Sequence, residues 1–168
     1  MATTVSETIR LAVAETLSTY LNDELRGQGL PKVPVEAVNQ FSDYGKTEKL
    51  PRVFVSIQGW QRIESTIGED GFQHEEYAVI VTHGVKSADG VRDVTAFGFQ
   101  LHDCIKKVLE VHWDLPVPSC PEGQADEILV VSGSIDPLAT QAESNFIHFG
   151  EVSATVRITR QLQTHGGE

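Results

Sequence analysis

Apolar residues recur at helical spacing in two long segments of the chain, Val5–Leu25 and Val91–Val111. Thr4 precedes the first segment with Glu7 three residues later, which is the pattern of a capping box, and Gly27 follows as a typical helix end. We therefore predict two long helices. The inward positions expected in the first are Ile9, Ala12, Val13, Leu17, Tyr20 and Leu21.

Alternating apolar and polar residues mark four other segments as strands, because side chains along a strand point to opposite faces in turn. The last segment alternates most regularly. The second has apolar residues on both faces, which indicates an inner strand covered on both sides. The four predicted strands are Arg52–Trp60, Glu75–His83, Glu127–Ser132 and Glu151–Thr159.

The connections are polar or rich in proline, as expected of loops. Gln61–Gln73 reads as a wide acidic tip between the first two strands, and Trp113–Ala125 contains three prolines. Gly27–Lys49 is a long connection with a short strand expected around Val33–Val38. A further strand is expected at Asn145–Gly150.

The order helix, two strands, helix, two strands predicts an α+β fold of two layers. A mostly antiparallel sheet then carries two long helices packed on one face. A length of 168 residues favours one domain spanning residues 1–168, with residues 162–168 as a polar tail.

The charge balance restricts the classes of partner. Thirteen basic and 24 acidic residues give a formal charge of −11, which argues against wrapping nucleic acid by neutralising phosphates. An acidic wall is compatible with a pore that DNA passes without sticking. The sequence has no apolar run of about 18 residues and no basic, apolar start typical of a secretory signal, so we expect a cytoplasmic origin and no membrane contact.

No motif predicts a reaction or a cofactor. Lys46 lies in Gly45-Lys46-Thr47, the tail of a phosphate-binding loop, but Gln40 stands where that loop needs its first glycine. No serine lies in a nucleophile elbow. The sequence therefore predicts no catalytic residue and no cofactor.

Cysteine and histidine residues show no spacing typical of a metal site. A cluster of Cys104, His112 and Cys120 is a candidate for zinc, but a packed thiol and surface imidazoles are the favoured interpretation. A cytoplasmic chain favours two free thiols. The acidic pairs Glu69-Asp70, Glu75-Glu76 and Asp126-Glu127 are expected to solvate the sheet and protect its edges.

Four segments together resemble the tail terminator proteins of long-tailed bacteriophages and the related tail-completion and head–tail joining proteins. They are Leu50–Ile57 (L-P-R-V-F-V-S-I), Glu76–Val81 (E-Y-A-V-I-V), the predicted helix Val91–Leu109 and Glu151–Thr159 (E-V-S-A-T-V-R-I-T). The likeness is one of pattern and order, and it extends from Thr4 to Gln161.

The resemblance implies a virion protein that forms a homo-oligomeric ring, expected to be a hexamer, on the end of the tail tube. Such a ring stops the tube protein from polymerising, presents a surface to the head–tail connector protein, and lets double-stranded DNA pass through its centre. Glu64, Glu69 and Asp70 are candidates to face the channel or a neighbouring subunit. The full set of expected interface residues is Tyr44, Lys46, Trp60, Arg62, Glu64, Glu69, Asp70, Phe72 and Trp113.

Two alternatives come from other classes of protein. One is a small enzyme whose site uses Glu75, His83 or His102, which requires a pocket where these groups converge. The other is a dimeric ligand-binding module with Trp60 or Trp113 lining a cleft.

Overall fold

A computed structural model describes residues 4–37, 50–65, 71–88, 90–114 and 124–161. The elements run α1 (Val5–Gly27), β1 (Val35–Ala37), β2 (Arg52–Ser65), β3 (Phe72–Ser87), α2 (Val91–Val111), β4 (Gln124–Ile135), β5 (Thr140–Ala142) and β6 (Asn145–Gln161). The predicted α+β fold with two long helices and a mostly antiparallel sheet is confirmed. The short strand expected around Val33–Val38 is β1, whereas the three-residue strand β5 was not predicted.

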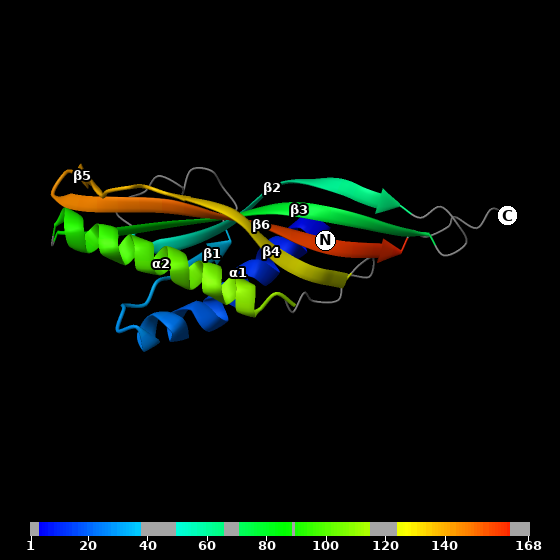
Figure 1. Ribbon diagram of the computed structural model, residues 1–168, viewed down its shortest axis with the longest axis horizontal. Coiled ribbons are helices and arrows are strands. Elements are labelled where there is room, and N and C mark those ends of the chain that lie inside the picture. Colours follow the sequence, from blue (N-terminus) through cyan, green and yellow to red (C-terminus); the bar gives the residue numbers. More distant parts are fainter. Residues whose placement is uncertain (1–3, 38–49, 66–70, 89, 115–123, 162–168) are drawn as a thin grey trace.

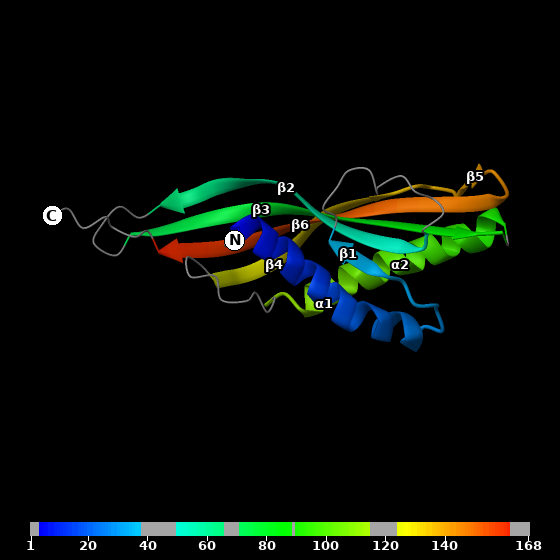
Figure 2. The same ribbon diagram turned by 180° about the vertical axis from the view of Figure 1, so that it is seen from behind.

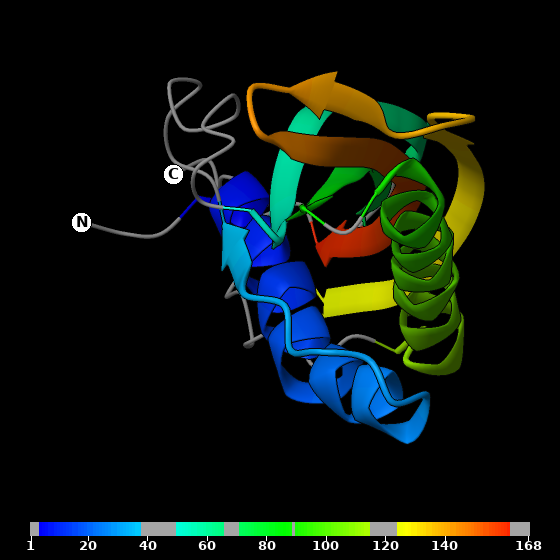
Figure 3. The same cartoon turned by 90° about the vertical axis from the view of Figure 1, so that its left-hand side faces the viewer.

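The sheet has the strand order β1-β2-β3-β6-β4, with β5 paired to β6 outside this path. Among the strands that the structure describes, only β1 and β2 run parallel. The long strands β3 and β6 form the centre, and they pair without interruption from Phe72–Gln161 to Ser87–Phe146. The sheet is long and strongly curved, as the end-on view shows (Figure 3).

Both helices begin as the sequence predicts. The Thr4 Oγ1 atom accepts a hydrogen bond from the Glu7 backbone N–H at 3.2 Å, which satisfies one of the donors left free at a helix start. The core contains residues of both helices and of the central strands, and its fully buried members include Leu17, Leu101 and Val79. Tyr20, predicted to point inward, is 39% exposed and stacks on the His112 ring at 3.6 Å between centroids.

Several predicted strands are too short. β2 continues to Ser65 and β3 already begins at Phe72, so residues 61–65 and 72–73 of the predicted tip Gln61–Gln73 lie in strands. The predicted strands Asn145–Gly150 and Glu151–Thr159 form one strand, β6, because both pair with the continuous β3.

At one end of the molecule, four strands extend past the end of α2 and form an arm (Figure 1). The arm consists of residues 57–65 of β2, 72–79 of β3, 154–161 of β6 and 124–130 of β4. Its order across the sheet is β2-β3-β6-β4. The short strand β5 lies at the opposite end of the long axis (Figures 1 and 2).

Candidate functional site

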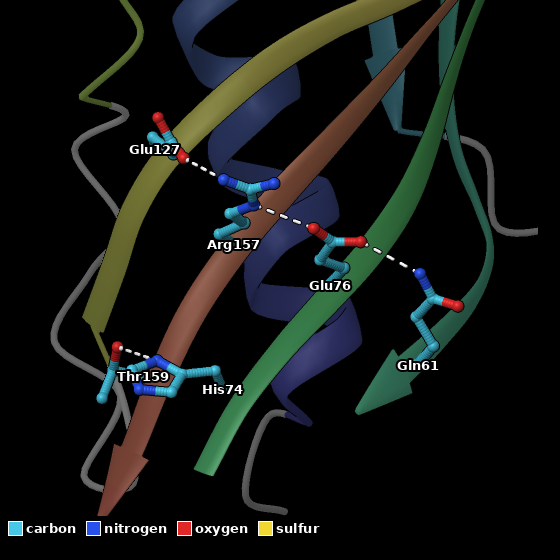
Figure 4. A network of polar contacts seen from close by, with 6 residues as sticks. All are labelled: Gln61, His74, Glu76, Glu127, Arg157 and Thr159. Atoms are coloured by element: carbon cyan, nitrogen blue, oxygen red, sulfur yellow. Dashed lines mark hydrogen bonds and ion pairs between the residues drawn. The ribbon is translucent and has the colours of Figure 1, made fainter. Parts of the chain in front are cut away.

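The face of the arm that lies away from α1 carries a row of polar side chains, one from each strand (Figure 4). The Gln61 amide donates to the Glu76 carboxylate at 3.0 Å. The Arg157 guanidinium donates to Glu76 and to Glu127, both at 2.8 Å. The Gln61 amide, and after it Arg157, hold the pKa of Glu76 below its usual range. The row fixes the register of four strands on a surface that is open to solvent.

The opposite face of the arm belongs to the core. Tyr77, Val156 and Ile128 lie in the row next to the polar one and are at most 4% exposed. Glu75 is 1% exposed on this face, where it accepts hydrogen bonds from the Tyr77 hydroxyl at 2.8 Å and from the Gln73 amide. The expectation that the Glu75-Glu76 pair solvates the sheet is therefore wrong for Glu75.

Each lateral edge of the arm exposes large apolar side chains. On the β2 edge, Trp60 is 58% and Ile63 is 50% exposed. On the β4 edge, Leu129 is 39% exposed, and Val131, which directly follows the arm beside α2, is 64% exposed. Exposed apolar groups gathered at one place mark interaction surfaces more often than scattered ones do.

Trp113 belongs to the β4 edge. The backbone carbonyl of Trp113 accepts a hydrogen bond from the Ile128 N–H at 2.8 Å. Trp113 is 55% exposed. The register therefore places the two tryptophans at opposite ends of one row across the sheet: Trp60, Tyr77, Val156, Ile128 and then Trp113.

An open hollow of about 390 Å³ adjoins Trp60, with Gln61, Glu76, Ala78 and Thr155 among its lining residues. Ala78 is exposed, so the prediction that β3 is covered on both sides is wrong at this point, although β3 is an inner strand as predicted.

The predicted interface residues are only partly brought together. Trp60 and Arg62 are exposed on the β2 edge, and Trp113 lies across the sheet. Glu64 pairs with His74, and Phe72 pairs with Gln161, in the strands of the arm. Tyr44, Lys46, Glu69, Asp70 and Cys120 lie outside the described residues. Sequence reasoning missed Ile63, Leu129, Val131 and the ion pairs of Arg157.

A second polar cluster lies under α2, where sequence reasoning expected surface imidazoles. His83 and His148 are instead fully buried. His83 Nε2 lies 2.9 Å from His102 Nδ1, and His148 Nε2 donates to the Asp136 carbonyl at 2.7 Å. The Nδ1 atoms of His83 and His148 are buried with no hydrogen-bond partner among the described residues.

Glycines on neighbouring elements make room for these rings. A Cβ atom at Gly98 would lie 1.8 Å from His148 Nδ1, and one at Gly150 would lie 2.5 Å from His83 Nε2. Burial, and after it the neighbouring His102 and His148, lower the pKa of His83 to about 3. The His83 ring is therefore neutral at physiological pH.

The residues of the alternative enzyme site, Glu75, His83 and His102, do not all lie together. His83 contacts His102, but Glu75 lies eight residues away along β3 with partners of its own. His102 does line an open hollow of about 400 Å³ between α2 and β4. The described residues contain no group of three side chains arranged to hold a metal ion. Cys104 is buried with a free thiol, and burial raises its pKa.

In the part of the chain that the structure describes, neither helix has a stretch long and apolar enough to cross a bilayer. No protein-family model matches the sequence. A search among curated proteins also gives no match.

Proposed function

We propose that this protein is a structural component of a phage tail and acts as a tail terminator. It forms a ring on the end of the tail tube, stops further addition of the tube protein, and offers its exposed face to the head–tail connector protein. In this proposal the two helices share one face of the sheet, and the arms contact neighbouring subunits or the tube.

The observation that carries the proposal is the pair of exposed apolar edges on opposite sides of one sheet. A head-to-tail ring requires two different surfaces on each subunit, one for each neighbour. The β2 edge with Trp60 and the β4 edge with Trp113 supply two such surfaces.

The charge supports a channel for DNA. A chain of formal charge −11 repels phosphate, so a ring of such chains lets a duplex slide through without holding it. The resemblance described above implies that the assembly is a hexamer, that its partner is the tail tube, and that it lies in the tail of the virion.

A direct test adds the purified chain to tube protein that is polymerising, and measures tube lengths and tube ends by negative-stain electron microscopy. We expect shorter tubes with a distinct cap, and an assembly whose mass is a multiple of the 18.4 kDa subunit. An unrelated acidic protein of similar size serves as the control. Tubes that keep growing, with no cap at any ratio of the two proteins, refute the proposal.

A further inference from the structure

The two edges of the arm match each other in position along the strands. Trp60 and Trp113 end the same row across the sheet. In the next row, Gln61 of β2 and Glu127 of β4 end the chain of polar contacts. A translation across the strands therefore brings the Trp60 side of one copy to the Trp113 side of another at the same level.

The two edges also differ in charge. The β2 edge carries the exposed guanidinium of Arg62 beside Trp60 and Ile63. The β4 edge carries Glu127, whose side chain is 33% exposed, and the exposed Asp114 next to Trp113. Unlike charges favour contact between the two different edges and disfavour contact of either edge with itself.

The edges are built to limit backbone pairing. Each edge strand has two register shifts, at Ile57/Gly59 and Arg62/Glu64 in β2 and at Ala125/Glu127 and Val130/Ser132 in β4. Bulges bend a strand and interrupt its ladder, which is a common defence against endless edge-to-edge pairing. The Ile128 N–H on the β4 edge is already bound by the Trp113 carbonyl.

We infer that copies of this chain associate head-to-tail through the arm, with Trp60, Arg62 and Ile63 of one copy packed on Trp113, Leu129 and Val131 of the next. Side chains make the contact, and the sheet does not continue from copy to copy. The inference deepens the proposed function and rests on it for the closure of the ring.

The test uses two single variants of the full chain, Trp60→Glu and Trp113→Glu. Each blocks one edge and leaves the other intact. Analytical ultracentrifugation of the wild-type chain is expected to show an assembly larger than a dimer, and each variant alone is expected to be monomeric. Because a head-to-tail contact needs one intact edge of each kind, an equal mixture of the variants is expected to form a dimer and nothing larger.

Leu138→Glu is the matched control. Leu138 is 62% exposed between β4 and β5 and lies outside the arm, so this variant is expected to assemble like the wild type. Circular dichroism of both tryptophan variants checks that they remain folded. As a second pair, Arg62→Glu is expected to weaken assembly, and Arg62→Lys is expected to keep it.

Three outcomes overturn the inference: a wild-type chain that is monomeric at all concentrations, tryptophan variants that assemble normally, or a variant mixture that remains monomeric. Tube capping is scored separately. Assembly through these edges without capping supports the inference and refutes the proposed function, whereas capping by both tryptophan variants supports the function and overturns the inference.

Discussion

Acid is expected to destabilise this protein through the buried His83 ring. Burial lowers the pKa of His83 from 6.5 to about 3, so the native state keeps this ring neutral where the unfolded chain protonates it. Above about pH 6.5 both states are neutral at this site and its contribution to stability is constant. As the pH falls below that value, His83 binds a proton in the unfolded state but not in the folded state. The free energy of unfolding therefore decreases.

The size of the effect follows from the shift of the pKa. Each pH unit between the two pKa values costs about 1.4 kcal/mol, so His83 alone removes roughly 2 kcal/mol by about pH 5 and about 5 kcal/mol at the limit. His102 adds to the loss, because burial lowers its pKa as well. The groups that face His83 are His102 on α2 and His148 on β6, and protonation of either ring would disfavour a charge on His83 further.

The assay is chemical denaturation at several pH values between about 7.5 and 5, for the wild type and for His83→Gln. The glutamine amide can still donate to His102 Nδ1 but does not titrate, so the comparison isolates the imidazole. We expect the variant to be less stable at neutral pH and to lose less stability on acidification. If stability falls with pH at the same slope in both proteins, the His83 ring is not the group responsible. An NMR resonance of His83 in the native protein that titrates near pH 6.5 would also contradict the reasoning.

Three further variants test local features of the fold, and each is measured by chemical denaturation. Gly98→Ala places a methyl group against the buried His148 ring and is expected to cost roughly 1–3 kcal/mol, whereas Gly27→Ala, with no atom within 4 Å of the added carbon, is expected to be neutral or stabilising; similar effects of the two would contradict the packing argument. Arg157→Met breaks the polar row of the arm and is expected to lower stability slightly, and by less in high salt; a loss that is independent of salt would assign the effect to packing. Thr4→Ala is expected to cost about 1 kcal/mol and Thr4→Ser much less, since the serine hydroxyl can still accept from the Glu7 N–H; equal losses would exclude a capping role.

The positions of the long elements could be predicted from sequence because periodicity and end signals are local properties of the chain. α2 matches its predicted bounds, and α1 differs only at its last turn. Strand ends were less predictable because pairing with a neighbour decides them. Polar residues such as Gln61 and Arg62 read as a loop in isolation, yet they remain in β2 because Glu76 and Glu75 pair with them.

The burial of the histidines and the position of the β4 edge depend on contacts between segments that are distant in the sequence. His83 is buried because Gly150, on a strand far along the chain, leaves space for the ring. Trp113 was named from the sequence only as a candidate interface residue. Its place on the β4 edge, level with Trp60, follows from strand order and register, which no local pattern contains.

Strand order and bulges together favour a closed assembly over an endless one. A flat sheet with two long, regular, apolar edges would add copies indefinitely and form a fibre. In this arm, regular pairing between the register shifts is limited to short segments of β2 and β4, and one donor on the β4 edge is already satisfied. In the proposed assembly, neighbouring copies meet mainly through Trp60 and Trp113, and side-chain packing sets their relative rotation. A heterologous contact with a fixed rotation closes into a ring when the rotation divides a full turn, which is the property that a cap on a tube of defined symmetry needs.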